Sequence, residues 1–107
     1  MKKILIFGSG QHSKVIFSEI MQLKDHRVIG FVDENIKKGK IIQVYKNKKY
    51  KIIGNIKSIN NLLDKNTSGI IAVGENFKRK EIAKKINKIY KKFNWMTLIS
   101  KNSIING

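Results

Sequence analysis

The chain has 107 residues, enough for one small domain built around its own hydrophobic core. It contains no cysteine, which excludes disulfide bonds and thiolate metal sites and favours a cytoplasmic location. The formal net charge is +16, which could indicate a nucleic-acid partner. However, Arg27 and Arg79 are the only arginines, and the lysines are spread along the whole chain, so we discount nucleic acid as a partner. Its apolar segments are all shorter than the ~20 residues that cross a bilayer, so we also expect no membrane partner.

The first third of the chain is predicted to contain two buried strands with a helix between them. The continuous apolar runs at 4–7 and 28–32 are typical of strands that are covered on both faces. Apolar residues recur at helical spacing through 11–24. A glycine turn, Gly8-Ser9-Gly10, joins the first strand to this helix, and Asp33-Glu34-Asn35 ends the second strand.

Residues 36–53 are predicted to be an insertion. Apolar stretches at 40–45 and 50–53 flank a lysine-rich turn, which indicates either a β-hairpin with one solvated face or a mobile flap. Gly54 ends the second stretch, and a short helix is expected at 58–63.

The last part of the chain repeats the strand and helix pattern. A buried strand is predicted at 69–73, a helix at 77–92 with Asn76 as its N-cap, and a fourth strand at 94–99. Alternating strands and helices predict an α/β fold with a parallel four-stranded sheet, helices on both faces and the hairpin-like insertion.

The glycine turn is a candidate ligand site. If the first strand lies between the second and third, the start of the first helix offers free N–H groups and its positive dipole end to a crevice at the strand ends. Gly8 and Gly10 would let an anion approach the backbone, and Asp33 is placed to accept hydrogen bonds from ribose hydroxyls or a base edge. Ser13 replaces the last glycine of the dinucleotide pattern G-x-G-x-x-G. A nucleotide-like ligand is therefore predicted, with NAD and a purely structural turn as alternatives.

His12 and Arg79 are two further candidates for this site. His12 either bonds a nearby carbonyl group or faces the ligand, and we favour a binding or positioning role. Arg79 lies in the first turn of its helix, where a cation is mildly unfavourable, so it could meet a ligand phosphate or an acid, or be one more solvated cation. The sequence shows no Ser-His-Asp set, no paired carboxylates and no metal-ligand cluster, so we predict no catalytic residue and no metal site in this chain.

Five segments, in order, cover nearly the whole chain and match a known pattern: KILIFGSGQHSKVI, VIGFVDEN, IIGNI, GIIAVGENFKRKEI and FNWMTLISKNSIING. Together they resemble the N-terminal domain of the sialic-acid O-acetyltransferase family, which includes bacterial acetyltransferases that act on UDP-linked 4-amino sugars. The resemblance implies a small Rossmann-like, three-layer domain over 1–99 that binds a nucleotide-sugar. It also implies that 100–107 is a linker to a left-handed β-helix domain that this chain lacks.

That second domain would bind acetyl-CoA, carry the catalytic histidine and form a homotrimer, so this chain alone is expected to be a monomer without a cofactor. The resemblance assigns the glycine turn to the nucleotide-sugar, Asp33 and Glu34 to the uridine part, and Gly54 to the same crevice. The residues expected to contact substrate are Gly8, Ser9, Gly10, Gln11, His12, Asp33, Glu34, Gly54, Asn76 and Arg79. The rival hypothesis is an NAD- or CoA-binding Rossmann domain that regulates without catalysis.

Overall fold

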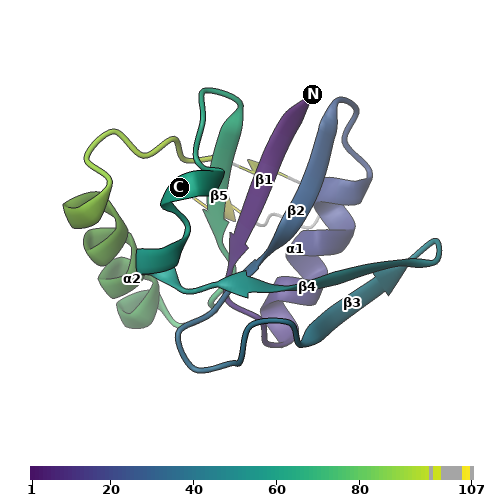
Figure 1. Ribbon diagram of the computed structural model, residues 1–107, viewed down its shortest axis with the longest axis horizontal. Helices are drawn as coiled ribbons and strands as arrows, with labels where there is room; N and C mark the ends of the chain where they lie inside the picture. The colour runs from purple at the N-terminus through teal and green to yellow at the C-terminus, as the bar shows by residue number, and fades with distance from the viewer. Residues whose placement is uncertain (97, 100–104, 107) are drawn as a thin grey trace.

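The computed structural model describes residues 1–96, 98–99 and 105–106, and its centre is a five-stranded sheet. The strand order is β3-β4-β2-β1-β5, with β1 between β2 and β5 as predicted. Four neighbouring strands are parallel, and β3 is antiparallel to β4 at one edge (Figure 1). The strands are β1 (Lys2–Phe7), β2 (His26–Val32), β3 (Ile41–Tyr45), β4 (Lys48–Gly54) and β5 (Thr67–Ile71).

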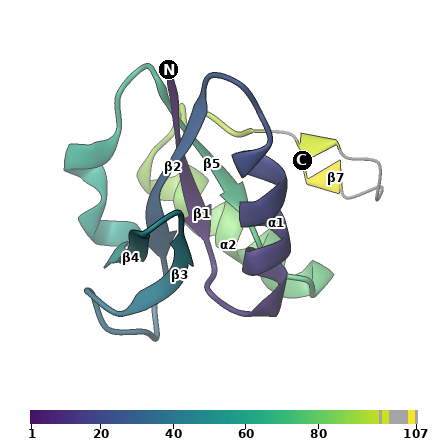
Figure 2. The ribbon, with the colours of Figure 1, turned by 90° about the vertical axis from the view of Figure 1, so that its right-hand side faces the viewer.

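Helices cover both faces of this sheet, which confirms the three-layer α/β fold (Figures 1 and 2). One face packs against α1 (Gln11–Met21), and the other packs against α2 (Asn76–Ile89) and two short 3-10 turns, η1 (Ile56–Ser58) and η2 (Asn60–Leu62). Side chains alternate along β1 because a strand has a period of two residues. Its even-numbered isoleucines therefore enter the core under α1, while Leu5 and Phe7 enter the core under α2.

The predicted insertion is part of the sheet. The fourth parallel strand is therefore β4, and not the stretch at 94–99 that the sequence predicted. The stretch at 40–53 forms the hairpin β3–β4, and β4 pairs in parallel with β2. Tyr50 and Ile52 of β4 are buried in the core under α1, which holds the strand in the sheet. The hairpin turns at Lys46 and Asn47, both with positive φ, as tight two-residue hairpin turns require. The structure therefore confirms the hairpin in place of the mobile flap.

The stretch at 94–99, predicted as the fourth strand, follows the outer edge of β5 through a single bridge. The Gly69 N–H group donates to the Asn94 carbonyl at 2.9 Å, and the Met96 N–H group donates to the Gly69 carbonyl at 2.8 Å. Beyond this bridge, β6 (Leu98–Ile99) pairs with β7 (Ile105–Asn106) in a separate two-stranded sheet. The rest of the predicted linker at 100–107 lies outside the described residues.

Aromatic packing, in place of a strand ladder, fixes this stretch. Phe7, Phe93 and Trp95 form an aromatic cluster, with ring centroids 5.6 Å apart for the two phenylalanines and 4.6 Å apart for Phe93 and Trp95. Gly69 of β5 lies beneath it, and a Cβ atom there would come within 2.6 Å of both phenyl rings. The absence of a side chain at Gly69 therefore makes room for the cluster.

The helix boundaries differ from the predicted ones by a few residues. The first helix ends at Met21, and Asp25 adopts a positive φ of 60° in the turn before β2. The N-cap of α2 is Glu75, not Asn76, which is already the first helical residue. The short helix predicted at 58–63 is replaced by η1 and η2. Within residues 1–96, 98–99 and 105–106, every helix is too short or too polar to span a lipid bilayer.

Candidate functional site

A cavity of about 620 Å³ lies where β1, β2 and β5 end. Its lining comes from the glycine turn, the residues after β2 and β5, η1, and one side of α2. This volume is within the roughly 300–1,000 Å³ of small-molecule sites. Of the ten predicted contact residues, seven line the cavity: Gly8, Ser9, Gly10, Gln11, His12, Asp33 and Glu34.

The two glycines of the turn have different physical roles. Gly8 has a φ of 113°, its N–H group donates to the Val32 carbonyl at 2.8 Å, and an added Cβ would lie 2.9 Å from the Ala72 carbonyl oxygen. Gly10 is the N-cap of α1 at an ordinary φ of −86°, and an added Cβ would meet no described heavy atom within 4 Å. Gly10 has no side chain to cap the helix. The Ser13 N–H group donates to the Gly10 carbonyl at 3.1 Å, so the N–H groups of Gln11 and His12 are the ones left for water or a ligand.

Asp33 ties the end of β2 to the glycine turn. The Ser9 hydroxyl group donates to Asp33 Oδ2 at 2.7 Å, and the Asn35 N–H group donates to Oδ1 at 2.8 Å. Each carboxylate oxygen can accept more than one hydrogen bond, so Asp33 keeps acceptor capacity toward the cavity. The start of α1 and the acid at the end of β2 thus lie side by side, as the argument from strand order predicted.

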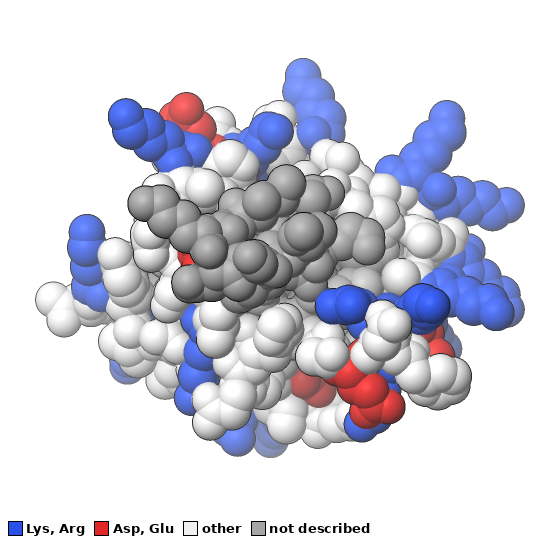
Figure 3. Space-filling model, turned by 180° about the vertical axis from the view of Figure 1, so that it is seen from behind, with Lys and Arg blue, Asp and Glu red and all other residues white. Residues whose placement is uncertain are grey.

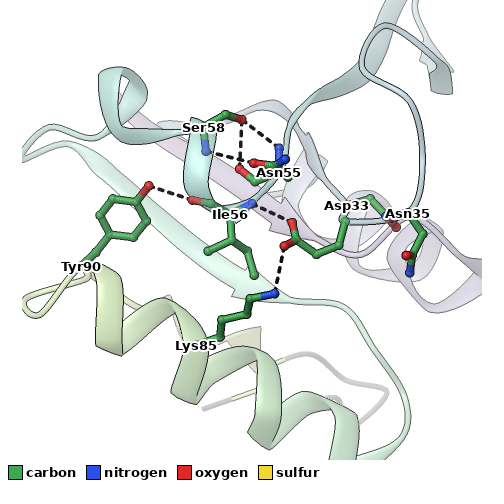
Figure 4. A network of polar contacts seen from close by, with 8 residues as sticks. Asp33, Asn35, Asn55, Ile56, Ser58, Lys85 and Tyr90 are labelled. Atoms are coloured by element: carbon green, nitrogen blue, oxygen red, sulfur yellow. Dashed lines mark hydrogen bonds and ion pairs between the residues drawn. The ribbon is translucent and has the colours of Figure 1, made fainter.

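Glu34 joins three walls of the cavity, and Figure 4 labels its partners Ile56 and Lys85. One carboxylate oxygen accepts the Ile56 N–H group of η1 at 2.8 Å, and the other pairs with Lys85 Nζ of α2 at 3.2 Å. The Tyr90 hydroxyl group donates to the Ile56 carbonyl at 2.7 Å, which links η1 to the end of α2 from the other side. Partial burial raises the pKa of Tyr90 above its usual value, so it stays protonated as a donor.

His12 brings an unsatisfied polar atom to the cavity. Its Nε2 atom is buried and has no hydrogen-bond partner among the described residues. The next residue, Ser13, is fully buried, and its hydroxyl group donates to the Gly10 carbonyl at the start of the helix. A buried ring nitrogen without a partner is costly, so a ligand atom that reaches His12 Nε2 would gain a hydrogen bond that the protein does not otherwise make.

The wall formed by α2 was not predicted. Lys78, Glu81, Ile82 and Lys85 line the cavity from two successive turns of this helix. They recur at helical spacing, but so do the solvated lysines of the same helix, so the sequence gives no signal that separates them. With these residues the lining contains three acids and two lysines, although the whole chain carries a net charge of +16.

Three predicted contact residues lie outside the lining. Gly54 is buried, its carbonyl accepts the Asp33 N–H group at 3.2 Å, and an added Cβ would collide with Ser58 Oγ. Arg79 Nη2 donates to the Asn76 side-chain oxygen at 3.1 Å on the exposed start of α2. Gly54 thus supports Asp33 through its carbonyl hydrogen bond, and contacts of Gly54, Asn76 and Arg79 with a ligand stay predictions. Within the described ranges, His, Asp and Glu side chains do not gather into a group of three that could hold a metal ion.

Comparison with known proteins places this fold in a family. Residues 3–86 match the family described as the PglD N-terminal domain. No curated protein matches the chain. Two solved structures of the acetyltransferase domain of PglB from Neisseria gonorrhoeae FA1090, the second in complex with acetyl coenzyme A, are 21% and 24% identical, each with a TM-score of 0.61.

The alignments cover 83% and 82% of this chain and 40% of each PglB chain. The chain therefore spans about two fifths of the length of these structures, and the likeness shows a shared fold. The family match covers most of the chain, from the start of β1 to the last turn of α2. The chain thus belongs to the PglD N-terminal domain family.

Proposed function

We propose that this chain is the nucleotide-sugar-binding domain of a bacterial sugar acetyltransferase. The observation that carries the proposal is one cavity lined both by the start of α1, where Gly10 leaves the N–H groups uncapped, and by the Asp33 carboxylate. A diphosphate suits the first feature, because a helix N-terminus favours negative charge. A ribose or uracil suits the second, because both carry hydrogen-bond donors for a carboxylate.

The remaining lining supports the same orientation of the ligand. Lys78 and Lys85 place cationic side chains on the α2 wall, where they would share the charge of the diphosphate. His12 Nε2 would bond an oxygen or hydroxyl group of the ligand, as its lack of a partner among the described residues suggests. Family membership and the likeness to an acetyltransferase domain support a role for the sugar part as the acceptor in acetyl transfer.

In the complete protein, an amine or hydroxyl group of the sugar would attack the thioester carbonyl of acetyl-CoA. The new C–N or C–O bond would form as the C–S bond breaks, the thiol would leave, and a base outside this chain would take the proton. The share of the chain is positioning, which can lower a barrier by several kcal/mol when the reacting groups are held tightly. Acetyl-CoA binding, trimer formation and a cytoplasmic location belong to this proposal, with the first two assigned to a second domain.

Isothermal titration with UDP, a UDP-4-amino sugar, NAD and CoA tests the proposal. We expect the UDP-sugar to bind most tightly and Asp33→Asn to weaken it by about tenfold or more, because a hydrogen bond to a charged group contributes about 1.5–3 kcal/mol. Asp25→Asn is the matched control, because Asp25 lies in the turn before β2, at the opposite end of the strands from the cavity. Asparagine also tolerates the positive φ at this position. Tightest binding of NAD or CoA would favour the regulatory rival, and no binding of any nucleotide would overturn the proposal.

A further inference from the structure

The β3–β4 hairpin carries a concentration of charge that the nucleotide-sugar site does not use. Residues 37–51, here called the basic hairpin, contain seven lysines and no acidic residue. The basic hairpin extends from the edge of the sheet away from α2 (Figure 1). The described cavity lining contains none of its residues, so a partner on the basic hairpin would leave the cavity open.

One face of the basic hairpin combines these charges with exposed aliphatic side chains. Ile41 pairs with Lys51, and Val44 pairs with Lys49 across the two strands. Ile41 is 43% exposed and Val44 is 56% exposed, and both lysines are exposed. Tyr50 of β4 is buried in the core under α1, so by the alternation of a strand Lys49 and Lys51 point to the opposite face.

We propose that the basic hairpin binds the surface of an anionic lipid bilayer. Lysines near such a surface gain electrostatic attraction to acidic headgroups. Ile41 and Val44 lie beside them and can enter the boundary between headgroups and acyl chains, where apolar surface leaves water.

Other partners fit this surface less well. A second copy paired along the free edge of β3 would bring seven lysines from each chain together. Nucleic acid would contact the lysines, but it would leave Ile41 and Val44 in water, and the basic hairpin has no arginine for phosphate or base recognition. The earlier expectation of no membrane partner came from segments that cross a bilayer, whereas this contact is peripheral. It is also independent of the proposed nucleotide-sugar site.

Basic side chains also cover other faces, so the experiment must separate local charge from net charge (Figure 3). Co-sedimentation compares phosphatidylcholine vesicles with vesicles containing about 30% phosphatidylglycerol, in low and high salt. Two double lysine-to-glutamine variants lower the net charge equally, one on the face of β4 that carries Lys49 and Lys51 and one on the exposed side of α2. They are K49Q/K51Q and K80Q/K84Q.

We expect binding to the anionic vesicles alone, weakened by salt. The β4 variant should lose roughly twenty-five-fold in partition coefficient, from about fivefold per lysine, and the α2 variant should lose far less. Equal losses in the two variants would show that only net charge acts, and an absence of binding to anionic vesicles would also overturn the proposal. Loss of duplex DNA or RNA binding in the β4 variant, with vesicle binding unchanged, would assign the surface to nucleic acid.

A matched pair of variants tests the contribution of aliphatic side chains to vesicle binding. Val44→Ser removes an exposed methyl pair from the basic hairpin, and Val15→Ser removes one from α1, where Val15 is 44% exposed. We expect Val44→Ser to weaken vesicle binding several-fold, since each buried CH₂ contributes about 0.8 kcal/mol, and Val15→Ser to leave it unchanged. Equal binding of both variants would contradict insertion of the apolar side chains.

Discussion

Replacing Gly10 by alanine tests whether the glycine turn is needed for ligand binding separately from its effect on stability. The backbone at Gly10 is extended, with φ −86° and ψ −161°, which alanine adopts without strain. Alanine is a poorer N-cap than glycine by several tenths of a kcal/mol or more. It also lowers the entropy of the unfolded chain, which stabilises by about 0.4–1 kcal/mol. The two effects oppose each other, so we expect the free energy of unfolding to change by less than about 1 kcal/mol.

The binding of a nucleotide-sugar should respond much more strongly. The new methyl group would meet no described heavy atom within 4 Å, on a residue that lines the cavity beside the N–H groups that we assign to the diphosphate. A phosphate oxygen that must move away from those groups loses a charge-assisted hydrogen bond, so affinity should fall by about tenfold or more. Titration calorimetry of Gly10→Ala with a UDP-sugar, beside urea unfolding of the same variant, measures both quantities.

Gly8→Ala is the contrasting variant, because it should lower the stability of the fold itself. At a φ of 113° an L-residue is strained, and the added Cβ would lie 2.9 Å from the Ala72 carbonyl oxygen. Strain and overpacking each cost about 1–3 kcal/mol, so we expect a loss of roughly 2–6 kcal/mol in the free energy of unfolding. The reasoning is refuted if folded Gly10→Ala binds the UDP-sugar as tightly as the natural sequence, or if Gly8→Ala is as stable as Gly10→Ala.

Three further predictions concern stability. Lys3 and neighbouring donors hold the pKa of Asp64 at about 2, below the ordinary 3.8. The contribution of Asp64 to the free energy of unfolding is therefore complete above about pH 4 and is lost as the pH falls toward 2. Over that pH range, the urea midpoint should fall more steeply for the natural chain than for Asp64→Asn. Tyr90→Phe removes the hydrogen bond to the Ile56 carbonyl and should cost about 1 kcal/mol in urea unfolding, whereas an unchanged midpoint would mean that water replaces the hydroxyl group. Gly69→Ala should cost about 1–3 kcal/mol by overpacking the aromatic cluster and should alter the tryptophan emission, and an unchanged spectrum and midpoint would contradict that packing.

The centre of the sheet could be predicted because its strands are buried on both faces. Continuous apolar runs at β1 and β2, each ending at a polar turn, fix both the strands and the edge where a ligand site forms. The place of β4 was less visible, because lysines on its solvated face hide the alternation of Tyr50 and Ile52. The stretch at 94–99 was mistaken for a strand of the main sheet. Trp95 instead packs in the aromatic cluster and makes one bridge to Gly69, and β6 pairs with β7 in a separate sheet.

Part of the candidate site could likewise be predicted from local sequence, and part of it depends on tertiary packing. A glycine turn and an acid at neighbouring strand ends are local features, and the sheet order brings them together. The α2 wall depends on the rotation and placement of a helix, and Lys78 and Lys85 are indistinguishable in sequence from the solvated lysines around them. The structural constraint on Gly54 also depends on packing, and its contact with a ligand stays a prediction. Its need for glycine arises from Ser58, which lies close in space through η1.

Asp33 and Glu34 show how adjacent carboxylates can take different parts in one cavity. Glu34 is paired with the Lys85 ammonium group, so much of its charge is compensated within the protein, and its contacts hold η1 and α2 in place. The donors to Asp33 are a hydroxyl group and an amide, which orient the carboxylate and leave its net charge unpaired by them. A neutral donor such as a ribose hydroxyl therefore gains more from Asp33 than from Glu34, since a hydrogen bond to an uncompensated charge is the stronger one. On this argument we expect Asp33 to recognise the nucleoside of the proposed ligand, and Glu34 to preserve the shape of the cavity.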